Sequence, residues 1–85
     1  MIEEQITFHN EVNIRVQAQV FIGRRLVSTC LADPGEFHEL PSGSVRHDIY
    51  VKDAATGWEV ARKINNEAAS IVLRQHEGHY MLSEY

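Results

Sequence analysis

The amino-acid sequence predicts an all-β fold, an antiparallel β-sandwich of seven or eight short strands. Turn-forming residues recur roughly every 8–14 positions, a spacing typical of sandwiches and barrels. The segments between the turns alternate apolar and polar residues, as strands do when one face is buried. Hydrophobic residues make up 44% of the chain and charged residues 24%, which are ordinary values for a globular protein. We therefore expect residues 1–85 to form one domain.

The N-terminal part of the chain predicts two strands. Ile6 and Phe8 indicate the first. In residues 12–22 every even-numbered position is apolar, and every position between them except Phe21 is polar. A strand this long would extend about 36 Å at about 3.3 Å per residue. That is long for so small a domain, so we expect a bend or a bulge within it.

A tight turn at Gly23-Arg24-Arg25 predicts a return strand over residues 26–31. A two-residue loop pairs even positions of the first strand with odd positions of the second. Val27, Thr29 and Leu31 are therefore expected on the buried face. Cys30 is expected on the opposite face as a small packing residue, because nothing in its predicted surroundings would activate the thiol.

The middle of the chain predicts three further strands, separated by turns rich in Pro, Gly, Ser and Asp. Alternation is clear in residues 45–52, where Ile49 and Val51 face one side and Tyr50 and Lys52 the other. Trp58 is expected in the core. The three strands are predicted over residues 36–40, 45–52 and 58–62, with turns at 32–35, 41–44 and 53–57.

Residues 59–75 leave two interpretations open. Apolar residues from Val60 to Val72 also lie at helical spacing, so the alternative fold is α+β, with a helix at about 59–75. Against the helix, Asn65-Asn66 would lie in its middle, and a β-branched run follows. We favour a strand, a loop and a second strand.

The last hairpin is predicted over residues 70–75 and 79–84, around the turn Glu77-Gly78. In this register Leu73 faces Leu82 on the core side. His76 faces His79 on the other side.

Three features resemble immunoglobulin-like and transthyretin-like sandwiches in outline. They are the long first hairpin, the Pro-Gly-Glu turn at residues 34–36 and the hairpin loop from Asp53 to Gly57. The resemblance implies an architecture only and assigns no functional residue, since one fold carries many functions.

Charge and composition exclude several classes of function. The net charge of −4 argues against a nucleic-acid partner, because a phosphate-backbone binder needs an excess of Lys and Arg on one face. No stretch has the roughly 18 apolar residues of a membrane span. The N-terminus lacks the basic and apolar regions of a secretory signal, and the single cysteine excludes an internal disulfide. We therefore expect a cytoplasmic protein.

His76 and His79 are the candidates for a metal site. They flank a two-residue turn, so their side chains are expected on one face, with Cα atoms about 5.5 Å apart. Two imidazoles so placed could share a Zn²⁺ with a third ligand, which the sequence does not indicate. The leading expectation is therefore no cofactor. A small metal-binding protein or metal-dependent enzyme is the alternative function.

Four other residues are candidates for binding. Phe21 and Tyr50 are aromatic residues predicted to face solvent. Arg24 and Arg25 lie at a hairpin tip, where a phosphate or carboxylate could bind. A cluster of exposed aromatic residues would indicate a contact surface. Phe21 and Tyr50, together with Trp58, give a second alternative function, a module that binds carbohydrate or another small ligand.

The leading prediction is a non-enzymatic binding or assembly module. The chain has no recognisable catalytic motif and no phosphate-binding loop. The sheet edges of a small sandwich can pair with a strand of another protein, and self-association adds the buried surface that a small domain lacks. We therefore expect a protein partner, or a second copy in a homodimer, to dock at the sheet edges.

Overall fold

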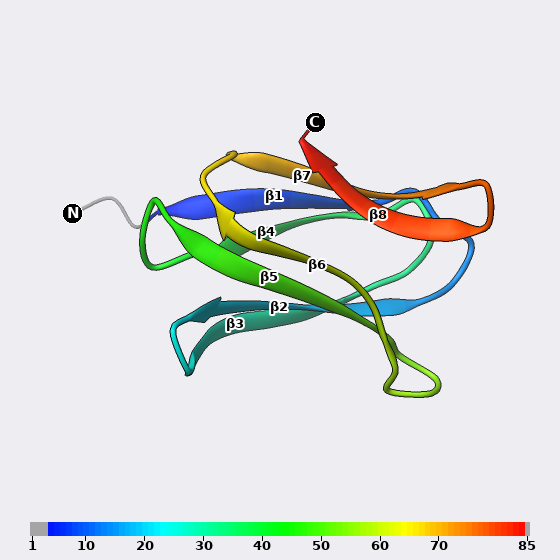
Figure 1. The fold of residues 1–85 in the computed structure, drawn as a ribbon, viewed down its shortest axis with the longest axis horizontal. Helices are drawn as coiled ribbons and strands as arrows, with labels where there is room; N and C mark the ends of the chain where they lie inside the picture. Colours follow the sequence, from blue (N-terminus) through cyan, green and yellow to red (C-terminus); the bar gives the residue numbers. More distant parts are fainter. Residues whose placement is uncertain (1–3, 85) are drawn as a thin grey trace.

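The computed structural model describes residues 4–84, which form eight strands and no helix (Figure 1). The all-β prediction is confirmed, and no helix of this range is long and apolar enough to cross a membrane. The strands are β1 (Gln5–Asn10), β2 (Val16–Ile22), β3 (Arg25–Ala32), β4 (Phe37–Pro41), β5 (His47–Asp53), β6 (Glu59–Asn66), β7 (Ser70–His76) and β8 (His79–Glu84).

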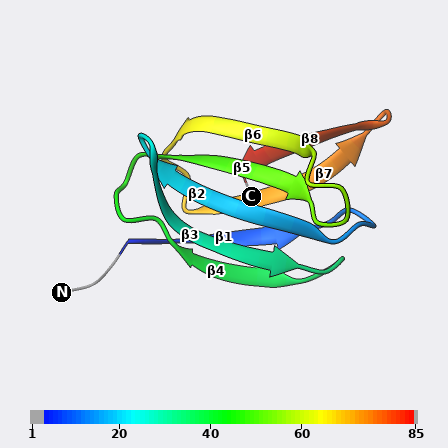
Figure 2. The same cartoon turned by 90° about the horizontal axis from the view of Figure 1, so that it is seen from below.

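The strands form two four-stranded sheets that pack face to face as a β-sandwich (Figures 1 and 2). Sheet A has the order β4-β1-β7-β8, and sheet B has the order β3-β2-β5-β6. Neighbouring strands are antiparallel except β1 and β7, which run parallel. A parallel pair needs a long connection between its strands. Here that connection contains β4 and all of sheet B.

The core lies between the sheets and consists of the residues that alternation places inward. On β2, Val16 and Val20 have no exposed surface, whereas Gln17 between them is only partly buried. Ile49 on β5 is equally buried, and Phe8 supplies the corresponding packing from β1. Each large side chain buried in this way stabilises the fold by about 1.5–3 kcal/mol.

The long strand predicted over residues 12–22 contains the expected bend. β2 begins only at Val16, and residues 12–14 form the bend before it. The buried side chain of Asn10 holds this segment. Its Nδ2 donates to the carbonyls of Ile14 at 2.9 Å and Ala32 at 3.1 Å, and its Oδ1 accepts from the N–H of Val12 at 3.1 Å.

The β2–β3 hairpin contains a bulge that the sequence did not predict. Next to the turn the register is the expected one, with Phe21 opposite Leu26. The next pair is Val20 with Ser28, so Val27 is an extra residue in β3. A bulge of this kind shifts the register by one residue for the rest of the strand.

The bulge makes part of the face assignment for β3 wrong. Cys30 lies opposite the buried Ala18 and packs against the core, although it was expected on the other face. Thr29 and Leu31 point outward and are exposed, although they were expected to be buried. A shift of one residue exchanges the two faces of a strand, because side chains alternate with a period of two.

The helix considered for residues 59–75 is wrong, and the strand–loop–strand interpretation is confirmed. Asn66 ends β6 and forms a local turn. Its Nδ2 donates to the carbonyl of Ala68 at 2.9 Å, and its Oδ1 accepts from the N–H of Ala68 at 3.2 Å. Asn65 has a φ of 56°, a left-handed conformation that Asn tolerates better than most residues.

Trp58 is not in the core, and its side chain is 75% exposed. It is the last residue of the β5–β6 loop, where its carbonyl accepts a hydrogen bond from the N–H of Asp53 at 2.8 Å. The loop closes beyond Val51, the last buried residue of β5. The indole therefore lies past the part of sheet B that packs against sheet A.

Candidate functional site

The outer face of sheet B carries an aromatic pair. Phe21 on β2 and Tyr50 on β5 are both partly exposed, on the solvent side predicted for them. Tyr50 lies opposite Gln19, so Phe21 is its diagonal neighbour. The ring centroids are 5.4 Å apart with an interplanar angle of 88°, a T-shaped contact that is worth about 0.5–1.5 kcal/mol beyond burial. The structure therefore brings two of the predicted binding residues together.

Arg62 on β6 extends this surface. Its guanidinium carbon lies 5.4 Å from the centroid of the Tyr50 ring, a cation–π contact. Its Nε donates to Oε2 of Glu59 at 2.7 Å. The sequence did not reveal Arg62 or Glu59 as neighbours of Tyr50, because irregularities in the β5–β6 register decide which β6 side chains face it.

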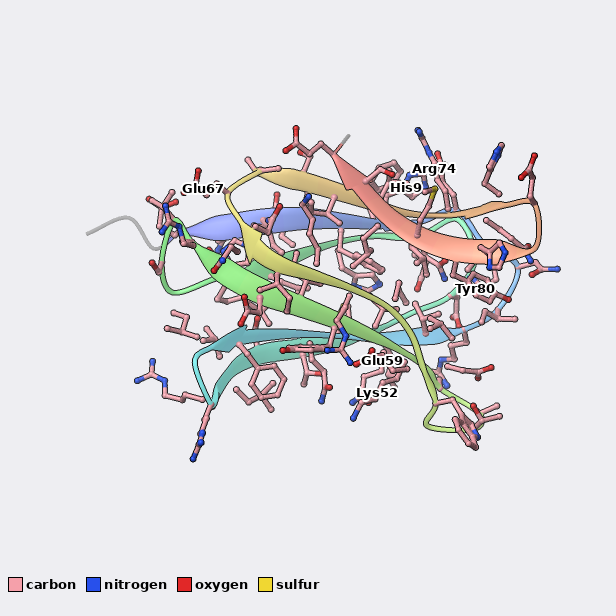
Figure 3. The ribbon with its side chains drawn as sticks, viewed as in Figure 1. His9, Lys52, Glu59, Glu67, Arg74 and Tyr80 are labelled. Carbon is pink, nitrogen blue, oxygen red and sulfur yellow. The ribbon has the colours of Figure 1, made fainter. Side chains whose placement is uncertain are left out.

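A shallow hollow of about 400 Å³ lies beside the aromatic pair. Two of its lining residues, Arg24 and Lys52, form no ion pair with any residue from 4 to 84. Figure 3 shows Lys52 and Glu59 close together on this side of the sandwich. Lys52 lies two residues after Tyr50 on β5, so the alternation of side chains along this strand could have identified it as a neighbour of Tyr50 on the outer face. The lining residues are Gln19, Phe21, Gly23, Arg24, Tyr50, Lys52 and Glu59.

Arg25, the fourth predicted binding residue, does not line this hollow. It begins β3, pairs with Ile22 across the turn and is exposed. Its neighbour Arg24 is the only one of the two arginines that lies beside the aromatic pair.

His76 and His79 form the cross-strand pair that was predicted. The turn between them places Glu77 at a φ of 51° and Gly78 at 82°, as a tight hairpin requires. Both imidazoles are exposed, and Nε2 of His76 lies 3.9 Å from Oε1 of Glu77. Within residues 4–84, no group of three or more His, Cys, Asp or Glu side chains is arranged to hold a metal ion.

The outer face of sheet A is held by contacts among its own side chains. The imidazole of His9 stacks on Phe37, with ring centroids 3.8 Å apart and planes at 9°. Glu11 accepts from Nε of Arg74 at 2.8 Å, and its other carboxylate oxygen is 3.6 Å from Nδ1 of His9. His9 and Arg74 both lie on this side in Figure 3. Val72, which faces outward between them, has no exposed surface.

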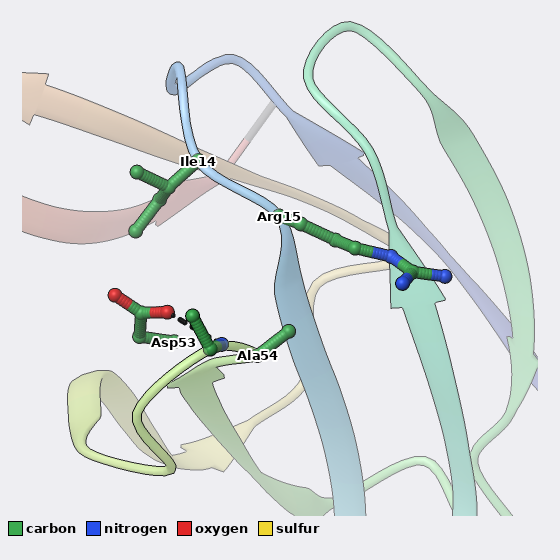
Figure 4. A pocket seen from close by; sticks show the side chains of 5 residues that line it. Ile14, Arg15, Asp53 and Ala54 are labelled. Carbon is green, nitrogen blue, oxygen red and sulfur yellow. Dashed lines mark hydrogen bonds between the residues drawn. The ribbon is translucent and has the colours of Figure 1, made fainter.

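A second hollow, of about 350 Å³, lies between the bend before β2 and the β5–β6 loop (Figure 4). Its polar groups are already bound. The carboxylate of Asp53 accepts from the N–H of Ala55 at 2.8 Å, and Arg15 points away to Asp33, with Nε 3.2 Å from Oδ1. This hollow is therefore a feature of the loop rather than a reactive centre.

The sandwich has four edge strands, and they differ in charge. β4 is five residues long and contains Glu39 and Pro41. β6 contains three charged residues, and Lys63 among them faces the core side opposite Ile49. β8 has four uncharged residues between His79 and Glu84. β3 has seven, from Leu26 to Ala32.

The ladder between β2 and β5 shows which backbone groups of β3 face the free edge. Ala54 N–H donates to the carbonyl of Arg15 at 3.0 Å, so the odd-numbered residues of β2 bond to β5 and the even-numbered ones to β3. Their β3 partners beyond the bulge are Ser28, Cys30 and Ala32. The N–H and C=O groups of Thr29 and Leu31 therefore point away from sheet B.

Comparisons with known proteins add no family to this description. A scan against family models, a search of curated proteins and a search of solved structures each found no match to this chain. The function is therefore argued from the geometry of the molecule.

Proposed function

We propose that this protein is a non-enzymatic interaction module that docks an extended protein segment at the free edge of β3. The observation that carries the proposal is the run from Leu26 to Ala32, the longest uncharged stretch among the four edge strands of residues 4–84. Exposed edges usually carry charges, prolines or short strands that prevent pairing with another chain. β3 has neither a charge nor a proline between its ends. It does contain the bulge at Val27, and β4 touches it where Ser28 Oγ donates to the carbonyl of Pro41, but neither feature takes up the outward backbone groups of Thr29 and Leu31.

The geometry of β3 suits the addition of a strand. The outward N–H and C=O groups of Thr29 and Leu31 would form the ladder, as in other cases of strand addition. The side chains of Leu26 and Leu31 are 47% and 46% exposed and would supply apolar contacts beside that ladder. Main-chain bonds then give affinity, and these two leucines give specificity.

Selection of peptides tests this proposal. A phage-displayed library of random linear peptides is selected on the immobilised protein, and the enriched peptides are titrated into labelled protein by NMR. We expect the amide signals of Leu26, Thr29 and Leu31 to shift most. Leu31→Lys should weaken binding at least about tenfold, because a lysine on the edge opposes strand addition.

Ile64→Lys is the matched control, since Ile64 is 49% exposed on the opposite edge of the same sheet. It should leave peptide binding unchanged. The proposal is wrong if the peptides map to another surface, or if the two lysine variants behave alike.

A second candidate function is favoured by the aromatic pair, which lies beside two cations that form no ion pair with the described residues 4–84. Phe21 and Tyr50 offer an apolar platform, and Arg24 and Lys52 offer positive charge in a chain of net charge −4. An anionic small ligand, such as a carboxylated sugar, has both a ring face that packs on aromatic side chains and a negative charge that binds the cations.

Titration with glucuronate and with glucose, followed by NMR, tests the second candidate. Glucuronate should shift the signals of Tyr50 and Lys52, and Tyr50→Ala should abolish the shifts. Trp58→Ala is the control, because it removes an exposed aromatic residue that does not line the hollow. Equal responses to the two sugars would eliminate the role of the cations.

A further inference from the structure

The β3 residues that face the free edge are arranged symmetrically about Thr29. Val27 is the extra residue of the bulge and takes no place in the ladder. Leu26 and Leu31 therefore each lie two ladder positions from Thr29, one on either side. Leu26 pairs with the outward-facing Phe21, so its side chain is on the same outer face as those of Thr29 and Leu31.

A second copy of β3 running in the opposite direction matches this arrangement. A twofold axis at Thr29 places Thr29 opposite itself and Leu26 opposite Leu31 of the other copy. The outward-facing backbone groups of Thr29 then meet those of Thr29 in the other copy, and those of Leu31 lie opposite Leu26. The two leucine pairs lie on the outer face, where both side chains are about half exposed in the single chain. Cross-strand apolar pairs of this kind contribute to sheet stability.

The charges at the two ends of β3 are complementary in the same arrangement. Arg24 and Arg25 precede the uncharged run, and Asp33 and Glu36 follow it. Antiparallel pairing brings the basic end of each copy beside the acidic end of the other. Asp33 already contacts Arg15, but its side chain is 59% exposed, so it can accept a second cation.

The opposite edge of sheet B lacks this complementarity. Self-pairing of β6 would bring Arg62 and Lys63 of one copy close to those of the other, and like charges on facing strands are destabilising. β4 is short and contains Pro41, which has no N–H to donate.

From this symmetry we propose that the segment docked on β3 is β3 of a second copy, paired antiparallel about a twofold axis at Thr29. This inference rests on the proposed function, because it requires the free edge of β3. It joins sheet B of the two copies into one continuous sheet. Stable interfaces bury about 1,200–2,000 Å², and a single pair of edge strands buries less, so association is reversible and depends on concentration.

Sedimentation equilibrium with charge variants at the axis tests the proposal. The wild-type protein should associate to a dimer as its concentration rises. Thr29→Lys and Thr29→Glu should each be monomeric over the same range, because each places two like charges opposite each other. An equimolar mixture of the two variants should recover the dimer. Thr29 is exposed, so both variants should keep the circular dichroism of the wild type, and they should keep its thermal melting at concentrations where the wild type is monomeric.

Ile64→Lys is again the matched control and should associate as the wild type does. Recovery of the dimer in the mixture is the decisive result, since it requires residue 29 of one copy to lie close to residue 29 of the other. A wild-type protein that stays monomeric at all concentrations overturns the proposal. So does a dimer that Thr29→Lys leaves intact.

A disulfide tests the register independently. In a Cys30→Ser background, Thr29→Cys places two thiols on a hydrogen-bonded pair with Cα atoms about 5.5 Å apart, which a disulfide can bridge. Mild oxidation should yield a covalent dimer. Ile64→Cys in the same background should yield far less, and equal yields overturn the register.

The two proposals fail in different ways. If the protein is a monomer and the selected peptides still map to β3, the second copy is the wrong partner and the proposed function holds. If the protein dimerises without regard to residue 29 and the peptides bind elsewhere, both proposals are wrong.

Discussion

β3 and β6 are the two edges of the same sheet, and they are equally long. Each has eight residues, and each pairs with its neighbour through a bulge or irregularity. Their composition differs. β3 has no charged residue after Arg25, whereas β6 contains Glu59, Arg62 and Lys63.

The difference shows how an edge becomes closed to a second strand. Lys63 lies on the core-facing side of β6, opposite Ile49, where a docked strand would take its charge out of water. The end of β6 is also bound internally, because the N–H of Asn65 donates to the carboxylate of Asp48 at 2.9 Å. At β3, neither an inward charge nor a bond of this kind occupies the free backbone groups of Thr29 and Leu31 in the described chain. Length and position in the sheet are thus equal, and composition separates the open edge from the closed one.

The largest effect is expected for a substitution that unfolds the sandwich, because both edges of sheet B are then lost. Val16 is fully buried on β2, the strand that links β3 to the rest of sheet B. Val16→Asp buries an unpaired charge and should cost at least about 3 kcal/mol of unfolding free energy. Gln17→Glu, on the outer face, should change it by no more than about 0.5 kcal/mol. Urea denaturation measures both, and equal effects would contradict the face assignment of β2.

A smaller effect should disturb β6 alone. Asn66 is fully buried, and its Nδ2 lies 2.9 Å from Nε2 of His47. Asn66→Ala leaves Nε2 of the buried His47 and the partly buried backbone groups of Ala68 without these partners and should cost about 2–3 kcal/mol. Amide hydrogen exchange should become faster in β6, and exchange in β3 should change less. Asn65→Gly is the control, because glycine accepts the φ of 56°, and its effect should stay within about 1 kcal/mol.

Removal of the positive charges on β6 should allow this edge to pair with another strand. In a Thr29→Lys background, where β3 cannot self-pair, Arg62→Thr and Lys63→Thr together leave β6 without its two cations. We expect association to strengthen at least about tenfold relative to the Thr29→Lys parent, because charges on an edge oppose pairing. Sedimentation equilibrium measures it. An unchanged monomer would show that the charges are not what separates the two edges.

The thiol of Cys30 reports which face of β3 is covered. Burial raises the pKa of Cys30, so less thiolate is present in the folded protein than in the unfolded chain. Reaction with a disulfide reagent at mildly alkaline pH should be at least about tenfold slower in the folded state. Leu31→Cys in a Cys30→Ser background should react faster than Cys30, since residue 31 points outward. The opposite order would restore the face assignment that the sequence suggested.

The smallest expected effect concerns the turn that links β3 to β4. The N–H of Asp33 donates to Glu36 at 2.7 Å, and this bond, followed by the contact with His38, lowers the pKa of Glu36. Because the pKa of Glu36 is lower in the folded state, its ionised carboxylate stabilises the fold at pH values above 4.5, the pKa in the unfolded chain. This stabilisation is lost as the pH falls through the pKa of the folded state.

Thermal melting between neutral pH and about pH 3 measures this contribution. Glu36→Gln should reduce the fall of the melting temperature with decreasing pH. Glu39→Gln should not, because the carboxyl of Glu39 has no such bond in the described residues. Identical acid profiles for the two variants would contradict the role of Glu36.

Much of the fold could be predicted because its signals are local. The alternation of β2 and β5 identified their buried faces, and the Glu77-Gly78 turn fixed the register that places His76 opposite His79. The same alternation placed Phe21 and Tyr50 on the solvent side. It could not show that their rings meet, because that contact depends on how two strands far apart in the sequence align.

The sequence by itself determined which residues alternate and where the chain turns, since a strand's faces and a tight turn depend on neighbouring residues. Only the tertiary structure decided that β1 runs parallel to β7, that Trp58 lies outside the core and that a bulge at Val27 turns Thr29 and Leu31 outward. These features depend on which distant strands pair and where the two sheets cease to overlap. The open edge of β3 is among them, because an edge exists only once every strand has its place in a sheet.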